Sequence, residues 1–175
     1  MAEPDRSGTR HRSRRRGVVP TRAATVAVLL IATAAHGTPP EAACVAVIGY
    51  PEETPLASVP LSVVDPGFTI TYVHSVTRTP VVETYVASPH GFVQTSIRFE
   101  QHGPGLPTEA GAGERWQRVD GRFVVTMARP VATIRMRVHA DQAPLLEAPG
   151  ATVALTQWGN RAIGLSPTRC ATEPR

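Results

Sequence analysis

Hydrophobic and polar residues alternate in short runs through most of the chain, and glycine and proline separate the runs. The alternation is clearest at 133–139, where Ile134, Met136 and Val138 fall on one side of an extended chain. A period of two is typical of a β-strand with one buried face. No stretch has helical periodicity long enough to predict a helix. Further strands are predicted at 44–50, 61–64, 116–119, 122–127, 151–156 and 162–165, with loops at 111–113 and 143–150.

The stretch 68–107 combines strand pattern, turn residues and clustered polar residues, and it predicts three antiparallel strands ending in a Gly/Pro loop. If Arg78-Thr79 forms a two-residue turn, His74 faces Glu83 on the returning strand. If Pro89-His90 forms the next turn, Glu83 faces the third strand at Ser96. The predicted core face carries Val73, Val82, Val86, Val93, Ile97 and Phe99, and the predicted polar face carries Tyr72, His74, Glu83, Tyr85, Ser96 and Arg98.

The polar face has three interpretations. It is a solvated sheet surface on which tyrosines pack and charges pair, or it is a recognition patch for an anion. In the second case the patch comprises His74, Ser75, Arg78, Glu83, Ser96, Arg98, Gly103 and Gly105, with backbone N–H groups of the glycine loop contributing. A catalytic triad is the weakest interpretation, because a triad needs its base between nucleophile and carboxylate, and here the glutamate lies in the middle. No catalytic residue, cofactor or metal site is therefore predicted.

Turn chemistry extends the β pattern to the rest of the chain. Asp120-Gly121 between two apolar runs is a strong hairpin signal. Seventeen prolines and fourteen glycines lie among the short runs. This spacing predicts an all-β fold, a single antiparallel β-sandwich or barrel-like domain at 38–175 that follows an N-terminal segment at 1–37.

Charge is concentrated in that N-terminal segment. Residues 1–37 hold seven arginines and two acids (7 − 2 = +5), whereas residues 38–175 hold eleven arginines and twelve acids (11 − 12 = −1). The nearly neutral domain argues against a nucleic-acid partner. The apolar run at 23–35 after the arginines is typical of a secretory signal and is shorter than a spanning helix needs. Export to the periplasm or to the outer face of the cytoplasmic membrane is predicted, with an uncleaved membrane anchor as the alternative.

The two cysteines lie at opposite ends of the predicted domain, at Cys44 and Cys170. An oxidising compartment would allow a disulfide between the first and last elements, and unpaired cysteines are the alternative. Two distant cysteines supply no metal-ligand cluster.

Several of these residues resemble a family of small exported bacterial proteins, domain of unknown function 1850. The resemblance rests on 68–76 (FTITYVHSV), on Thr79-Pro80-Val81, on Glu83, and on the Gly-x-Gly-Leu-Pro loop at 103–107. His74, Ser75, Pro80 and Glu83 match family positions.

The resemblance implies an association with TRAP-type (tripartite, ATP-independent periplasmic) transporters, particularly those with a TAXI-type binding protein. The partner would be the transporter permease or its binding protein. The leading hypothesis is therefore an exported β-rich accessory or binding protein that is not an enzyme. The alternatives are a periplasmic hydrolase that uses His74 and a structural protein of the envelope.

Overall fold

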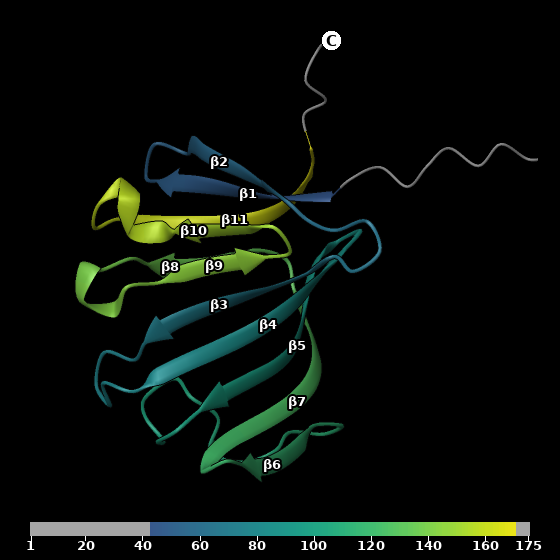
Figure 1. The fold of residues 1–175 in the computed structure, drawn as a ribbon, viewed down its shortest axis with the longest axis vertical. Coiled ribbons are helices and arrows are strands. Elements are labelled where there is room, and N and C mark those ends of the chain that lie inside the picture. Colours follow the sequence, from purple (N-terminus) through teal and green to yellow (C-terminus); the bar gives the residue numbers. More distant parts are fainter. Residues whose placement is uncertain (1–42, 171–175) are drawn as a thin grey trace, which may run out of the picture. The chain divides into compact units, whose positions relative to one another are not determined.

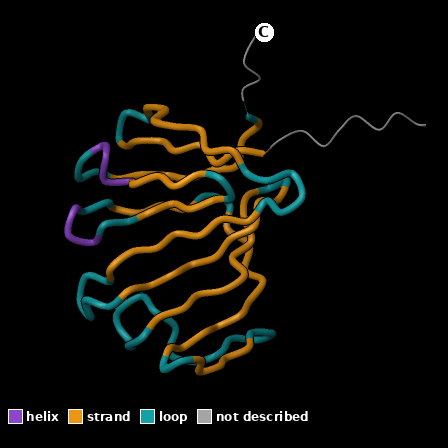
Figure 2. Tube along the Cα trace, viewed as in Figure 1, coloured by secondary structure: helices purple, strands orange, loops and turns teal. Residues whose placement is uncertain are grey.

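Two antiparallel sheets hold nearly all the regular structure in residues 43–170, the part of the chain that this computed structural model describes (Figures 1 and 2). The smaller sheet has the strand order β2-β1-β11-β8 and the larger has β10-β9-β3-β4-β5-β7-β6. The predicted all-β, antiparallel fold is confirmed. The bounds are β1 Ala43–Tyr50, β2 Thr54–Pro60, β3 Gly67–Val73, β4 Pro80–Ser88, β5 Gly91–Phe99, β6 Arg115–Val119, β7 Arg122–Val131, β8 Ile134–Arg137, β9 Leu145–Ala148, β10 Ala151–Ala154 and β11 Ala162–Arg169, with short 3-10 helices η1 at Ala140–Gln142 and η2 at Leu155–Trp158.

The N-terminal segment predicted to be a signal or an anchor lies outside the described residues. Within 43–170, no helix is long and apolar enough to cross a membrane.

The main core forms where the two sheets face each other. Val45 and Val47 of β1 point inward from the small sheet, and Phe68 and Ile70 of β3 meet them from the large sheet. These residues alternate with less buried neighbours, as one-sided burial of a strand requires. Alternating inward side chains from both sheets are what hold a β-sandwich together.

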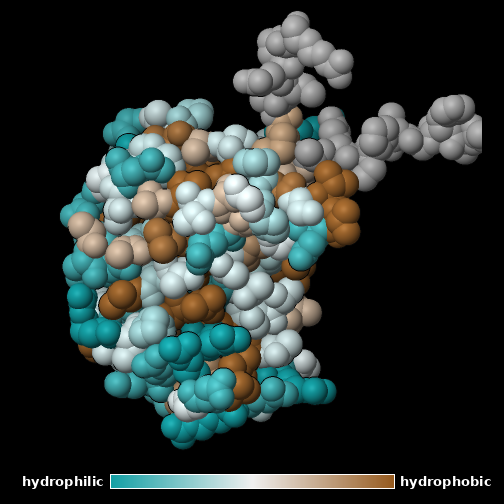
Figure 3. Space-filling model, viewed as in Figure 1, coloured by the Kyte–Doolittle hydropathy of each residue, from teal (hydrophilic) through white to brown (hydrophobic). Residues whose placement is uncertain are grey.

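A second core lies on the same inner face of the large sheet, toward β5 and β7. Val81, Ile97, Phe99, Val125 and Met127 supply the sheet side of this cluster, and Leu106 from the loop after β5 packs onto them. The large sheet therefore has two covers: the small sheet over one part, and the loop between β5 and β6 over the other. Hydrophilic surface gathers near β6 and β7, while apolar patches lie scattered among polar ones elsewhere (Figure 3).

A disulfide ties together β1 and the end of β11, the first and last strands along the chain, which are neighbours in the small sheet. Cys44 in β1 bonds to Cys170, directly after β11, across a sequence separation of 126 residues. The same two strands pair along their length, from Ala43 opposite Arg169 to Tyr50 opposite Ala162. Of the two alternatives for the cysteines, the structure shows the disulfide.

Most predicted strands are confirmed, but two segments were interpreted wrongly. Residues 61–64 are not a strand, because the Ser62 hydroxyl accepts the N–H groups of Val64 and Asp65 and turns the chain there. The strand lies earlier, as β2. The stretch 143–150, expected to be a loop, contains β9, whose Leu146 is fully buried. The stretch 151–156 is a strand for its first four residues and then becomes η2.

Candidate functional site

His74 directly follows β3, and its side chain holds together the turn that comes next. The predicted two-residue turn at Arg78-Thr79 is wrong: Val73 pairs with Pro80, so a six-residue loop connects β3 to β4. The His74 Nδ1 accepts the N–H groups of Val76 (3.2 Å) and Thr77 (3.1 Å), which holds the longer loop together. As a result Ile70, and not His74, faces Glu83 across the strands.

The other ring nitrogen of His74 connects this turn to the glycine loop. Since Nδ1 accepts two hydrogen bonds, Nε2 carries the proton and donates to the carbonyl oxygen of Pro104 at 3.1 Å. A Cβ added at Gly103 would lie 2.8 Å from the ring carbon Cε1 of His74. His74 as a whole is 6% exposed. His74 is thus a buried connector between two loops that the sequence places about 30 residues apart.

A β-bulge separates Ser96 and Arg98 from Glu83. The pairing Val86 with Val93 follows the predicted Pro89-His90 hairpin, but the register shifts between Thr84 and Tyr85. The extra residue in β5 is Thr95, whose hydroxyl donates to the Thr84 carbonyl oxygen at 3.3 Å. Beyond it, Ile97 and not Ser96 stands opposite Glu83. A one-residue shift moves every later side chain to the other face.

The two predicted faces are therefore corrected. Glu83 and Tyr85 share the inner face with Ile97 and Phe99, while Val73, Val82, Val86 and Val93 are only half-buried, on the outer face. Ser96 donates to the Thr84 hydroxyl at 3.1 Å on the outer face, and Arg98 is exposed there. The predicted row of His74, Glu83, Ser96 and Arg98 does not exist as one surface.

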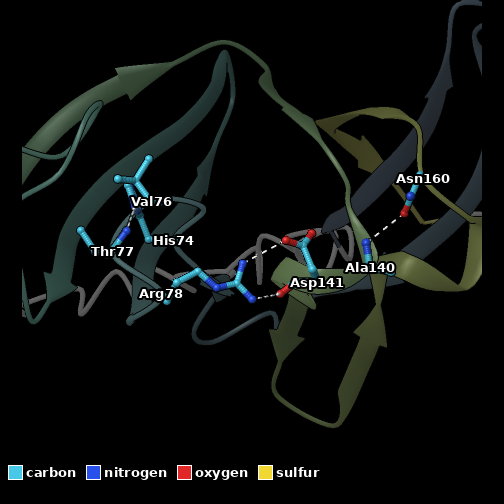
Figure 4. Close-up of polar contacts among 7 residues, drawn as sticks. All are labelled: His74, Val76, Thr77, Arg78, Ala140, Asp141 and Asn160. Carbon is cyan, nitrogen blue, oxygen red and sulfur yellow. Dashed lines mark hydrogen bonds and ion pairs between the residues drawn. The ribbon is translucent and has the colours of Figure 1, made fainter.

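The remaining candidates also lie apart. Arg78 reaches from the turn to η1, where its Nη1 lies 2.9 Å from the Asp141 carboxylate in an exposed ion pair (Figure 4). The exposed Ser75 lies in the same turn. Gly103 packs against His74, and Gly105 takes a left-handed φ of 84° in the loop that covers the second core. Of the eight predicted site residues, Glu83 and Gly105 line a common cavity.

Glu83 is held in place by two tyrosines on the inner face of the large sheet. The Tyr72 hydroxyl donates to Oε1 at 3.0 Å, and the Tyr85 hydroxyl donates to Oε2. Burial raises the pKa of both phenols well above the ordinary value of about 10, and the neighbouring Glu83 charge raises each pKa further. Both tyrosines therefore remain hydrogen-bond donors to the carboxylate.

This cluster lies where the two covers of the large sheet fail to meet, and we call the opening the seam. One cavity of the seam, about 510 Å3, lies under the loop at 105–114, and the other, about 360 Å3, lies beside β8 and η1. Glu83 and Tyr85 line both. Volumes of this size are ordinary for small-molecule sites.

Gln94 is a site residue that sequence reasoning missed. It lies opposite Tyr85, lines the first cavity of the seam and is 7% exposed. Within residues 43–170 its amide has no hydrogen-bond partner in the protein, and its polar atoms are not sealed from solvent, so the amide opens to the cavity. The only sequence signal was a polar residue inside an apolar strand. Because the bulge at Thr95 changes the register, the sequence did not show that Gln94 lies on the inner face of the sheet.

A charged pair forms the outer wall of the first cavity. Arg129 Nη2 lies 2.7 Å from Glu114 Oε1, and the Gly111 N–H donates to the other oxygen at 2.9 Å. The Gly111 N–H, followed by Arg129, lowers the pKa of Glu114. Over the described part of the chain, no group of three or more His, Cys, Asp or Glu is placed to hold a metal ion.

Comparison with known proteins gives one match. Residues 68–155 match the family model described as domain of unknown function (DUF1850). A search of curated proteins and a search of solved structures each returned no match. The matched stretch contains the His74 turn, the glycine loop and every residue named above in the seam.

Proposed function

The chain belongs to the domain of unknown function 1850 family, and we propose that it is an exported β-sandwich that binds a small ligand in the seam. The observation that carries this proposal is a carboxylate, Glu83, fixed by two tyrosyl hydroxyls on the floor of an open cleft. Convergent polar groups beside apolar side chains in one cavity are typical of small-molecule sites.

Two features favour binding over hydrolysis by His74. Both ring nitrogens of His74 already have protein partners, so neither is available to a substrate as a base. Ser96 lies on the opposite face of the sheet from Glu83, so no nucleophile, base and carboxylate stand in line.

Two features favour binding over a purely structural role. A structural β-sandwich has no need for an open cavity on its inner face, because packing there stabilises it. The Gln94 side chain also presents a polar amide with no protein partner to this cavity, where a ligand can bond to it.

Export is part of the proposal. It is supported by the apolar run at 23–35 behind the arginines, and by the Cys44–Cys170 disulfide, a bond that persists in oxidising compartments. The protein would act in the periplasm or at the outer face of the cytoplasmic membrane, by way of a signal peptide or an anchor.

We further propose that it works as an accessory of a TRAP-type transporter, a proposal that rests on the family resemblance of its sequence. The test is co-purification with the permease and with the transporter's binding protein. Recovery of the transporter from membranes carrying the tagged protein, and not from those carrying a tagged unrelated exported β-sandwich, supports the partnership. Equal recovery of the transporter with the two tagged proteins would refute the partnership.

Ligand binding is tested by blocking the first cavity. Thr108 lines it on the exposed loop, so Thr108→Trp fills the opening without touching the core, and Thr152→Trp places the same bulk on an exposed position of β10. Protein with its leader is expressed for export, incubated with the small-molecule fraction of a periplasmic extract, and analysed by mass spectrometry. Wild type and Thr152→Trp should retain a compound that Thr108→Trp loses. Identical retention by all three refutes binding in the seam.

A further inference from the structure

Hydrogen-bond chemistry restricts what the seam can bind. The two tyrosyl O–H groups are both used on Glu83, one on each carboxylate oxygen. A carboxylate oxygen has two lone-pair directions, and a phenolic oxygen that donates can still accept. The cluster of Tyr72, Glu83 and Tyr85 therefore offers a ligand acceptors only. The raised pKa of both phenols keeps this arrangement over the whole neutral range.

The charge of the first cavity also favours a cationic ligand. The charged residues that line it are Glu83, Glu109, Glu114 and Arg129. Arg129 is already paired with Glu114. What remains is negative, and in a partly enclosed site a negative wall attracts cations more strongly than it would in open water.

The rest of the lining provides a place for a carbon chain and for one more polar contact. Ile97, Leu106 and Met127 form an apolar wall beside Glu83, and all three are buried. Gln94 is more than nine-tenths buried, lines the cavity and has no partner among the described residues. Its amide carries both donors and an acceptor, so a ligand group placed beside Glu83 can satisfy it.

We propose that the seam binds a small organic cation with a primary ammonium group, in which the ammonium donates to Glu83 and to the Gln94 carbonyl while a short alkyl body lies on Ile97, Leu106 and Met127. This assignment of ligand class rests on the proposed function of the seam. An anion is excluded from the same position, because neither tyrosine has a free O–H and the cavity carries net negative charge.

The probe set isolates the two requirements, charge and N–H donation. Butylammonium has both, butyltrimethylammonium has the charge and the alkyl chain without an N–H, and butyrate has the alkyl chain with the opposite charge. Isothermal titration of the exported, disulfide-bonded protein should show butylammonium binding at least about 10-fold more tightly than butyltrimethylammonium, the factor expected for a charge-assisted hydrogen bond. Butyrate should show no heat of binding.

The chain offers a matched control carboxylate. Glu147 in β9 accepts the hydroxyls of Thr69 and Thr71 on the outer face of the same sheet, and so resembles Glu83 in its hydrogen bonding but lies outside the seam. Glu83→Gln should weaken butylammonium binding about 10-fold or more, while Glu147→Gln should leave it within about 2-fold, since that residue does not touch the ligand. Gln94→Leu, which keeps the bulk of the side chain, should also weaken binding and serves if Glu83→Gln does not fold.

The outcomes separate this inference from the proposed function. If butyrate or butyltrimethylammonium binds as well as butylammonium, or if Glu83→Gln and Gln94→Leu change nothing, the ammonium assignment is refuted. When Thr108→Trp nevertheless loses a compound from the extract, the seam is still a binding site for another class of ligand. When no probe binds and Thr108→Trp retains the same compounds as wild type, both proposals fall.

Discussion

Replacing Gly103 by alanine should destabilise the protein, because the added methyl group would overlap with two neighbouring side chains. A Cβ there would lie 2.8 Å from Cε1 of His74 and 2.9 Å from the methyl carbon of Thr77, closer than carbon atoms pack. The φ of Gly103 lies outside the left-handed region, so the backbone itself accepts alanine. The His74 ring cannot retreat easily, because both its nitrogens are bonded. Overpacking of this kind costs about 1–3 kcal/mol of unfolding free energy.

Gly103→Ala should not lower the unfolding free energy once the side chains of His74 and Thr77 are shortened. In a His74→Ala/Thr77→Ser background both close atoms are gone, while the serine keeps the hydroxyl that contacts Thr79 at 2.9 Å. Gly→Ala then acts mainly on the unfolded chain and stabilises by about 0.4–1 kcal/mol. The coupling free energy between Gly103 and its neighbours is thus about 1.4–4 kcal/mol, well above the additivity error of about 0.5 kcal/mol.

Urea unfolding followed by the fluorescence of the two tryptophans gives the four free energies of this cycle. Gly67→Ala is the control, because the nearest atom to its added Cβ, at 3.1 Å, belongs to the mobile end of the Asp65 side chain. It should stabilise the protein by about 0.4–1 kcal/mol, as Gly→Ala does where the backbone is unstrained. An equal loss from Gly103→Ala in both backgrounds would refute the reasoning, since the penalty would then come from the backbone and not from His74 and Thr77.

Three further results are expected. Reducing the Cys44–Cys170 disulfide should lower the unfolding free energy by about 5 kcal/mol, the loop-entropy value for a separation of 126 residues; an unchanged urea midpoint with and without reductant would contradict this. The raised pKa of Tyr72 and Tyr85 means that their stabilisation is complete below pH 10 and is lost as the pH rises toward their folded-state values. Wild type should accordingly lose stability above pH 10 more steeply than the double Tyr→Phe variant in unfolding measured against pH, and parallel curves would count against it. Arg78→Ala breaks an exposed ion pair and an exposed hydrogen bond to the Asp141 carbonyl oxygen, and it should cost less than about 1 kcal/mol in the same urea assay; a larger loss would show that these contacts order the turn.

What the sequence could predict depended on turns whose geometry is set by local residue type. Asp120 and Gly121 both take positive φ, 50° and 78°, in the hairpin between β6 and β7. That is the conformation for which Asp-Gly is selected, so the hairpin was predictable. The Pro89-His90 turn was equally local, and its first pairs, Val86 with Val93 and Ala87 with Phe92, follow from it.

The candidate site escaped prediction because two non-local details set its register. The loop from His74 to Thr79 is longer than two residues because a side chain, and not a standard turn, satisfies its backbone N–H groups. The bulge at Thr95 depends on how β5 meets both of its neighbours, since the pairing with β7 shifts at the same place. Glu83 could be found from its position in the motif, but its tyrosine partners and Gln94 could not.

The disulfide also determines how the protein responds to force. Cys44 and Cys170 are neighbours across the small sheet, although 126 residues of chain separate them. Tension applied between the two ends of the oxidised chain therefore passes from one cysteine to the other through a covalent bond, and the strands between them bear none of it. Both cores and the seam lie within that closed loop. While the bond is intact, end-to-end pulling leaves the seam unstretched, and after reduction the same pull loads β1 and β11 directly.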